Sequence, residues 1–207
     1  MIIPPIVEGQ GEVVAVPLLL RRLMDEAQAW GLEVGRPHRR QRTQLVKKDS
    51  LQRAVRIAAL QDSCAAILVL FDADDDCPKE LAPTLEVWAR EAAGGKPCAV
   101  VMANREYEAW FLASIEALRG RASLLLDATS HHEPEVPRDA KDQLELRMPR
   151  GASYSATVDQ PVLTAHLDLE SAYRGCRSFR RLVSAFGELA SAAGVAPAVW
   201  PPTAWVS

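Results

Sequence analysis

Apolar runs of strand length alternate with amphipathic stretches along the first 118 residues. The apolar runs lie at residues 2–7, 32–34, 65–71 and 98–102. Between and after them, apolar side chains recur at helical spacing over residues 14–30, 50–61, 78–93 and 105–118. Strand and helix therefore alternate four times, which predicts an α/β fold with a parallel sheet and helices on both faces.

The pattern changes after residue 120. Residues 120–175 are less regular, and their pattern suggests only a short helix at 139–148. Within the first part, residues 35–48 form an interruption that we interpret as a basic loop. An amphipathic helix is expected at 178–193, followed by an irregular tail. We therefore expect a core over residues 1–120 and a mostly helical C-terminal extension, residues 121–207, packed on it.

Composition supports a folded chain without a membrane segment. The chain has 207 residues, of which 48% are hydrophobic and 25% charged, enough for one domain with an extension. No apolar stretch approaches the length of a membrane span, and the N-terminus lacks the features of a signal peptide. The four cysteines form no Cys-x-x-Cys pair, which favours buried reduced thiols and a cytoplasmic location.

Acidic residues follow the third apolar run abruptly. Asp72, Asp74, Asp75 and Asp76 stand within five residues after Phe71. Carboxylates at a strand end are suitable ligands for Mg²⁺, which prefers oxygen in octahedral geometry. We expect Asp72 and Asp74 to be ligands, while Asp75 and Asp76 fit the alternative that they begin, or cap, the next helix.

Two further acidic groups follow the first and fourth strands. Glu8 and Glu12 flank a glycine turn after the first strand, and Glu106 and Glu108 follow the fourth. Because parallel strands with right-handed crossovers end at one edge of the sheet, these groups are expected to meet the Asp72 group there. Clustered carboxylates repel one another unless a cation neutralises them, so the pattern predicts one or two Mg²⁺ or Mn²⁺ ions. Glu106 and Glu108 lie two residues apart, so only one should face the metal.

These motifs resemble those of the TOPRIM domain of topoisomerases, primases and OLD-family nucleases. The resemblance rests on Glu8-Gly9 after the first strand and Asp72-x-Asp74 after the third. With the block 105–112 and Ser178-Phe179-Arg180-Arg181, the sequence resembles a bacterial TOPRIM-like family, domain-of-unknown-function family 4276.

The resemblance implies a role for each acidic residue. Glu8 would be a general acid/base or metal-associated carboxylate, Asp72 and Asp74 metal ligands, and Glu12 a second-metal ligand as in the OLD nucleases. Catalysis would then rest on Glu8, Asp72 and Asp74, and Mg²⁺-dependent nuclease chemistry is the leading hypothesis. The family resemblance also implies an ATPase-type protein partner in a bacterial defence setting.

The basic loop offers a surface for nucleic acid beside this edge. No acidic residue occurs from residue 34 to 48, and the phosphate-binding candidates are Arg36, Arg39, Arg40, Arg42, Lys47 and Lys48. An ordinary solvated loop and a contact with an acidic protein partner remain open alternatives. Lys141 and Arg180 are weaker candidates for transition-state charge.

Two other functions remain open. Gly9-x-Gly11 after a strand weakly imitates a dinucleotide fingerprint, although Glu8 and Glu12 would repel a pyrophosphate and Val14 replaces the third glycine. The acidic edge could instead bind a cation or a partner without catalysis, as a regulatory module.

Overall fold

The main sheet has four parallel strands, and the fold is α/β. The computed structural model describes residues 1–195, 197 and 199–207. The strand order is β4 (His38–Arg39), β2 (Pro5–Val7), β5 (Ile67–Asp72) and β6 (Cys98–Ala103). All neighbouring pairs are parallel, as the alternation of strands and helices predicted.

The predicted first strand is divided in two. Its first part, β1 (Ile2–Ile3), pairs with β3 (Glu33–Val34) in a separate two-stranded sheet, and its second part is β2. Pro4 stands between the parts and has no backbone N–H for a ladder, which explains the interruption. The expected second strand therefore lies in the small sheet, and β4 takes its place in the main one.

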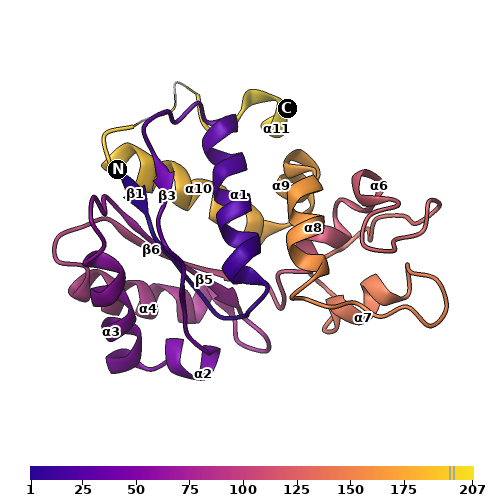
Figure 1. The fold of residues 1–207 in the computed structure, drawn as a ribbon, viewed down its shortest axis with the longest axis horizontal. Helices are drawn as coiled ribbons and strands as arrows, with labels where there is room; N and C mark the ends of the chain where they lie inside the picture. Colours follow the sequence, from indigo (N-terminus) through magenta and orange to yellow (C-terminus); the bar gives the residue numbers. More distant parts are fainter. Residues whose placement is uncertain (196, 198) are drawn as a thin grey trace.

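Helices cover both faces of the main sheet (Figure 1). One hydrophobic cluster joins alternate strand residues to α1 (Glu12–Glu26) and α10 (Arg177–Ala192), and a second joins the opposite face to α3 (Lys48–Ala59) and α4 (Pro78–Ala92). With both faces covered, every residue of β6 is buried, which accounts for its continuous apolar sequence.

Two segments of the first half differ from the sequence prediction. The basic segment is not simply a loop, because it contains β4 and the short helix α2 (Arg42–Leu45). The single helix expected at 105–118 is instead α5 (Ala109–Leu112) followed by α6 (Ile115–Leu118). From the sequence, Asn104 was expected to cap this helix, but its side-chain amide donates to the backbone oxygen of Glu135 at 3.5 Å, and the N-cap of α5 is Glu108.

The C-terminal half is more helical than expected. It contains α7 (Ala140–Glu145), α8 (Asp159–His166), α9 (Leu169–Gly175), α10 and α11 (Thr203–Val206). Residues 159–175 were expected to be less regular, and that expectation is wrong. The tail was expected to be irregular, which holds for residues 199–202 and is wrong only for α11. The weak local patterns hid these helices because they are short and stabilised mainly by tertiary packing. Their buried side chains belong to the same cluster as α1 and α10.

All four cysteines are free thiols. Cys98 and Cys176 are buried as expected, whereas Cys64 is half-buried and Cys77 exposed, which corrects the expectation for these two residues. Burial raises the pKa of the Cys98 thiol to about 12, so it stays protonated and behaves as a small apolar side chain.

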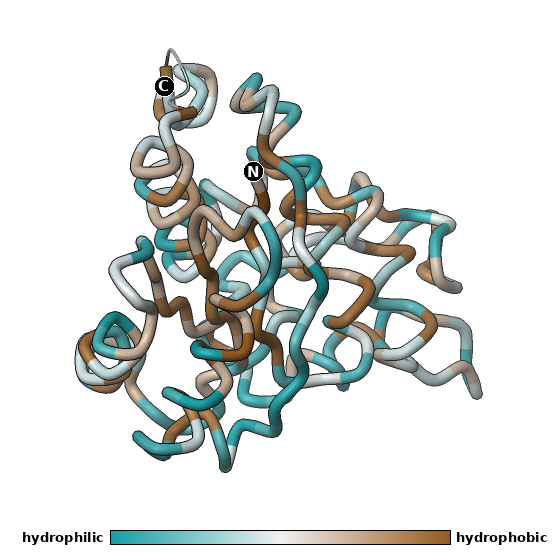
Figure 2. The backbone as a smooth tube through the Cα atoms, turned by 60° about the vertical axis from the view of Figure 1, so that its left-hand side comes forward, coloured by the Kyte–Doolittle hydropathy of each residue, from teal (hydrophilic) through white to brown (hydrophobic). Residues whose placement is uncertain are grey.

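Hydrophobic segments are short and lie mainly inside the molecule (Figure 2). Within residues 1–195, 197 and 199–207, no helix has the length and apolarity needed to cross a bilayer.

Candidate acidic site

Four acidic side chains come together at the carboxyl edge of the main sheet. Glu8 directly follows β2, Glu12 is the first residue of α1, Asp72 ends β5, and Glu108 lies just before α5. Since β2, β5 and β6 are parallel neighbours, their ends bring these residues to one place. Glu8, Glu12, Asp72 and Glu108 are called the carboxylate cluster below.

Glu12 folds back over the turn that precedes it. Its buried carboxylate accepts hydrogen bonds from the backbone N–H groups of Glu8 at 2.9 Å and Gly9 at 3.1 Å. Desolvation raises the pKa of Glu12 to about 7, and the nearby Glu8 and Glu108 carboxylates add to the rise, although the two amides oppose it. The backbone N–H groups of the glycine turn are therefore already bonded to the Glu12 carboxylate of the same chain.

Gly11 permits the close approach of this turn to the C-terminal half. A Cβ at this position would lie 2.2 Å from the backbone oxygen of Ala156 and 2.4 Å from Oε1 of Gln160. The second glycine of the apparent fingerprint is thus required for packing within the protein.

Asp72 links the end of β5 to the turn after β6. Its Oδ1 accepts a hydrogen bond from the backbone N–H of Tyr107 at 2.8 Å. Desolvation, followed by the Glu12 and Glu108 charges, raises the pKa of Asp72 well above its usual value, while Lys141 opposes the shift.

Glu108, not Glu106, faces the cluster. Glu108 is 1% exposed, and its Oε1 accepts hydrogen bonds from the Tyr154 hydroxyl at 2.9 Å and the Gln160 amide at 3.4 Å. Burial raises the pKa of this carboxyl. Glu106 instead accepts from the backbone N–H and the ammonium group of Lys141, each at 3.2 Å. The two-residue spacing predicted that only one of the two glutamates faces the site.

Lys141 of α7 places its positively charged ammonium group beside the cluster. Its Nζ lies 3.2 Å from Glu106 and 3.9 Å from Glu108. Although burial lowers the pKa of Lys141, the carboxylates of Glu108, Asp72 and Glu106 raise it above its usual value. From the sequence alone Lys141 was only a weak candidate, and Tyr154 and Gln160 carry no local signal that marks them as site residues.

Two carboxylate oxygens of the cluster have no hydrogen-bond partner. Within the part of the chain that the structure describes, Oε2 of Glu8 and Oε2 of Glu108 are buried and accept no hydrogen bond, although Oε2 of Glu108 lies 3.9 Å from Nζ of Lys141. Desolvation is the main cause that raises the pKa of Glu8, and the charge of Asp74 adds to it. A buried polar oxygen without a partner is unfavourable, so these two atoms are where a bound cation would be stabilising.

The cluster is not a preformed metal site. Among the described residues, no three Asp, Glu, His or Cys side chains converge closely enough to hold a metal ion. Of the predicted ligands, Glu8, Glu12, Asp72 and Glu108 could hold a cation if it drew them together, while Glu106 and Asp74 are directed to Lys141 and to Arg42.

Asp74 and its neighbours form ion pairs with arginines. Asp74 lies 3.2 Å from Nε of Arg42, Asp76 also pairs with Arg42, and Asp75 pairs with Arg138. Neither Asp75 nor Asp76 caps the following helix, because the N-cap position belongs to Cys77 and no side chain provides a cap. The expectation of a cap is therefore wrong.

The basic segment reaches the site through one residue. Arg42 donates to the backbone oxygens of Asp72 at 3.2 Å and Ala73 at 2.9 Å, so it holds the end of β5. Lys48 pairs with Glu91 of α4 at 2.9 Å, away from the cluster. Four further candidates of the basic segment form no ion pair among the described residues: Arg36, Arg39, Arg40 and Lys47. Arg180, the other weak candidate, donates to backbone oxygens of α9.

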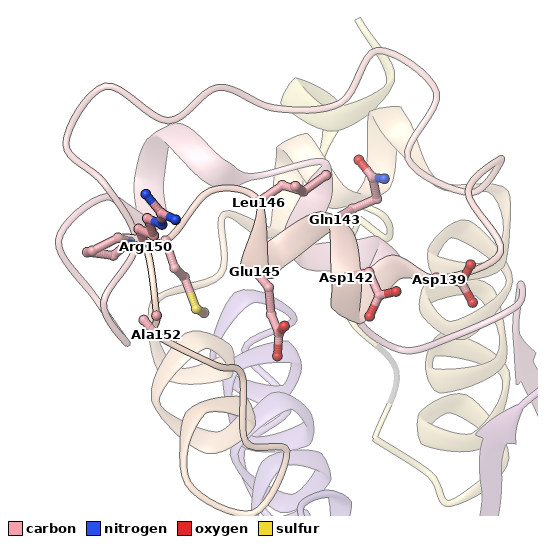
Figure 3. Close-up of a pocket in the computed structure, with 10 residues that line it drawn as sticks. Asp139, Asp142, Gln143, Glu145, Leu146, Arg150 and Ala152 are labelled. Carbon is pink, nitrogen blue, oxygen red and sulfur yellow. The ribbon is translucent and has the colours of Figure 1, made fainter.

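A cavity of about 660 Å³ lies beside α7 but outside the cluster. Asp142 and Glu145 extend from one side of the helix in Figure 3. None of the cluster carboxylates lines this cavity. One residue of its wall is nevertheless linked to the cluster. Glu145 accepts a hydrogen bond at 2.8 Å from the backbone N–H of Tyr154, and the hydroxyl of Tyr154 in turn donates to Glu108.

The fold and the site define an α/β protein with a largely buried carboxylate cluster at the carboxyl edge of a parallel sheet, in which Glu12 and Glu108 are buried and Glu8 and Asp72 half-buried. The chain belongs to the family described as "Domain of unknown function (DUF4276)", whose model matches residues 7–186. The matched segment includes every residue of the cluster, together with Lys141, Tyr154 and Gln160. No curated protein and no solved structure matches the chain.

Proposed function

We infer that this protein is a divalent-metal-dependent phosphodiesterase that acts on nucleic acid, with Mg²⁺ or Mn²⁺ as its cofactor. The observation that carries the proposal is the carboxylate cluster. Three strand ends bring together four acids, of which Glu12 and Glu108 are buried and Glu8 and Asp72 half-buried, and within the described residues one oxygen each of Glu8 and Glu108 has no hydrogen-bond partner. Such a set is costly to bury as anions and is stabilised by a divalent cation.

The bound metal would supply Lewis acidity and lower the pKa of a water molecule for attack on phosphorus. The protein's own residues would orient the ligands: Tyr154 and Gln160 hold Glu108, and the Tyr107 amide holds Asp72. Glu8, with its free oxygen, is suited to accept a proton. Lys141 and Arg42 place positive charge beside the carboxylates, which favours a polyanionic substrate.

Lys141 acts as the internal counter-ion while no metal is bound. Its ammonium group already neutralises part of the charge of Glu106 and Glu108. Metal binding would compete with this pairing and free Lys141 to contact a phosphate oxygen. This competition explains why the carboxylates need not be arranged as a finished metal site beforehand.

Nucleotide binding at the glycine turn is the less favoured alternative. The amides of Glu8 and Gly9, which a phosphate would need, already bond the Glu12 carboxylate. A bound phosphate would also have to stand beside two acidic side chains, which would repel it.

A non-enzymatic module is the second candidate function. The specific observation in its favour is the Lys141 ion pair, which partly compensates the cluster without any metal. In that case the acidic edge would regulate a protein partner, and an ATPase-type partner remains the proposal that the sequence resemblance suggests.

The test is a cleavage assay on labelled single- and double-stranded DNA and RNA with Mg²⁺, Mn²⁺ or EDTA. Asp72→Asn, Glu12→Gln and Glu108→Gln should each reduce cleavage by roughly 100-fold or more, because each variant loses a ligand for the metal that would stabilise the transition-state charge. Asp62→Asn is the matched control, because Asp62 is exposed and lies between α3 and β5, away from the site.

Cleavage that persists in EDTA, or that is equal in Asp72→Asn and the native protein, would refute the enzymatic proposal. Absence of cleavage together with Mn²⁺ binding that Asp72→Asn abolishes, measured by calorimetry, would favour the non-enzymatic module instead.

A further inference from the structure

Three arginines from distant parts of the chain meet beside the carboxylate cluster. Arg42 begins α2, Arg105 follows β6, and Arg138 precedes α7 in the C-terminal half. All three pair with carboxylates of residues 74–76, the loop that follows β5. The three arginines are called the arginine trio below, and residues 74–76 the acidic loop.

The arginine trio borders the carboxylate cluster. Arg42 donates to the backbone oxygen of Asp72, a member of the cluster, at 3.2 Å. The backbone oxygen of Arg105 accepts from the N–H of Asp74 at 2.9 Å, and Tyr107, two residues further on, donates its N–H to Oδ1 of Asp72 at 2.8 Å. A nucleic-acid strand with one phosphate at the cluster would therefore have others close to the trio.

The acidic loop fills two anion positions on these arginines. Oδ1 of Asp75 lies 3.7 Å from Nη1 of Arg105 and also pairs with Nη2 of Arg138, so one carboxylate oxygen lies between two guanidinium groups. At the second position Arg42 pairs with Asp74, at 3.2 Å, and with Asp76. A phosphate group offers oxygens for the same bonds, and arginine is well suited to bind it with two parallel N–H groups.

The carboxylates of the loop can leave these positions easily. The side chain of Asp75 is 75% exposed and that of Arg138 is 67% exposed, and exposed ion pairs add little to stability. Arg42, by contrast, is 18% exposed, and its bonds to the backbone oxygens of Asp72 and Ala73 hold its guanidinium group in place. One arginine of the trio thus stays fixed beside the cluster when its carboxylate partners move away.

The loop also balances the charge of the trio. Three guanidinium groups face three carboxylates, so the free protein has no net charge at this place. A single phosphate gains little there, because it must displace a carboxylate at one position while the other position stays filled. In a nucleic-acid strand the phosphates are linked, so binding at one position raises the effective concentration of phosphate at the other. The arrangement favours a polyanionic chain over a small anion.

We propose that the arginine trio binds backbone phosphates of a nucleic-acid strand at two positions, and that the three aspartates of the acidic loop occupy these positions until the strand displaces them. The proposal rests on the proposed function, because it takes nucleic acid as the substrate. The acidic loop is then an internal competitor of the substrate. Arg105 and Arg138 become substrate-binding residues, one from each half of the chain.

The test measures binding in EDTA, so that cleavage does not interfere. A fluorescein-labelled single strand of about 12 nucleotides is titrated with the protein and followed by anisotropy. Asp75→Asn should raise the affinity at least about threefold, because it removes the competing carboxylate from Arg105 and Arg138. Asp62→Asn makes the same change in net charge at an exposed position before β5, at the opposite edge of the sheet, and should leave the affinity unchanged.

Arg138→Ala should weaken binding at least about threefold. It should also reduce the slope of log affinity against log salt concentration by about 0.7, the contribution of one phosphate contact in a single strand. Lys96→Ala removes one positive charge just before β6, at the opposite edge of the sheet, and should change neither quantity. In the Arg138→Ala background, Asp75→Asn should raise the affinity less than in the native protein, because one of the two arginines that it frees is absent.

The proposal is overturned if the strand binds neither the native protein nor Asp75→Asn, or if Asp75→Asn gains no more affinity than Asp62→Asn. It is equally overturned if a polyaspartate peptide of the same charge binds as tightly as the strand, since the trio would then suit an acidic protein partner. Changes in unfolding temperature without changes in binding would show that the ion pairs serve the fold alone. Binding as expected without any cleavage would refute only the nuclease proposal, so the two failures are distinguishable.

Discussion

At the residue scale, the acidic site depends on two loops with unusual backbone conformations. Asp74 has φ +49° and Arg105 has φ +60°, and the N–H of Asp74 donates to the oxygen of Arg105 at 2.9 Å. Aspartate tolerates the left-handed region better than arginine does. The strain at Arg105 is maintained by the contact that joins the ends of β5 and β6.

Arg105→Gly should therefore be more stable than Arg105→Ala by about 1 kcal/mol, because glycine adopts positive φ without steric cost. Both variants lose the same side chain, whose pairing with Asp75 at 3.7 Å is exposed and weak. Urea unfolding of the two proteins measures the difference. An alanine variant that is as stable as the glycine variant would show that the backbone at this position is unstrained.

At the element scale, α10 is held by the C-terminal tail as well as by the sheet. The indole N–H of Trp200 donates to the backbone oxygen of Val183 at 2.7 Å, and the ring packs against Phe186 with centroids 5.4 Å apart. Gly187 makes this contact possible, since a Cβ there would lie 2.4 Å from Trp200. Trp200 thus belongs to the packing around α10, although residues 199–202 have no regular secondary structure, as the sequence predicted.

Gly187→Ala should lower stability by roughly 1–3 kcal/mol, the usual cost of overpacking, although alanine is the better helix former. In a Trp200→Ala background the clash is absent, and the same substitution should stabilise the protein by about 1 kcal/mol through helix propensity. A double-mutant cycle in urea measures both values. Equal effects of Gly187→Ala in the two backgrounds would contradict the contact.

At the scale of the whole molecule, the carboxylate cluster joins the two halves of the chain. Glu8, Glu12 and Asp72 come from the first half, while Lys141, Tyr154 and Gln160 come from the second. The hydrophobic cluster that contains α1 and α10 likewise spans both halves. The C-terminal half therefore completes both the core and the surroundings of the site.

This arrangement predicts how the stability of the metal-free protein varies with pH. Burial raises the pKa of Glu12 to about 7 and raises those of Glu8, Asp72 and Glu108. Between about pH 4.5 and 7 the folded state binds more protons than the unfolded state. The cluster's contribution to stability is therefore greatest at low pH and falls as pH rises, by an amount on the order of a few kcal/mol.

Thermal unfolding in EDTA from pH 4.5 to 8 measures this effect. Glu12→Gln should flatten the profile, because the amide cannot ionise, whereas Glu26→Gln, at an exposed position of α1, should not. A profile of Glu12→Gln parallel to that of the native protein would show that Glu12 does not titrate with a raised pKa.

The local pattern of hydrophobic and polar residues was sufficient to predict those elements whose periodicity is strong and whose apolar side chains are buried in the structure. It predicted the parallel sheet, the helices on both faces, and α1, α3, α4 and α10. It was insufficient where long-range contacts decide the structure. Residues 159–175 form α8 and α9 largely because they pack against α1 and α10, and residues 105–118 are divided at Ser114, whose hydroxyl accepts a hydrogen bond from the N–H of Asp168 at 2.8 Å.

The sequence by itself determined that acidic residues follow three strands and that parallel pairing places them on one edge. It also predicted that only one of Glu106 and Glu108 faces the site, which the structure confirms, but from an expected helix that the structure does not have there: both residues precede α5. Only the tertiary structure decided that Glu108 faces the site, that Lys141 is its counter-ion, and that Tyr154 and Gln160 hold it. Those contacts join residues 33–52 positions apart, and no local periodicity encodes such a pairing.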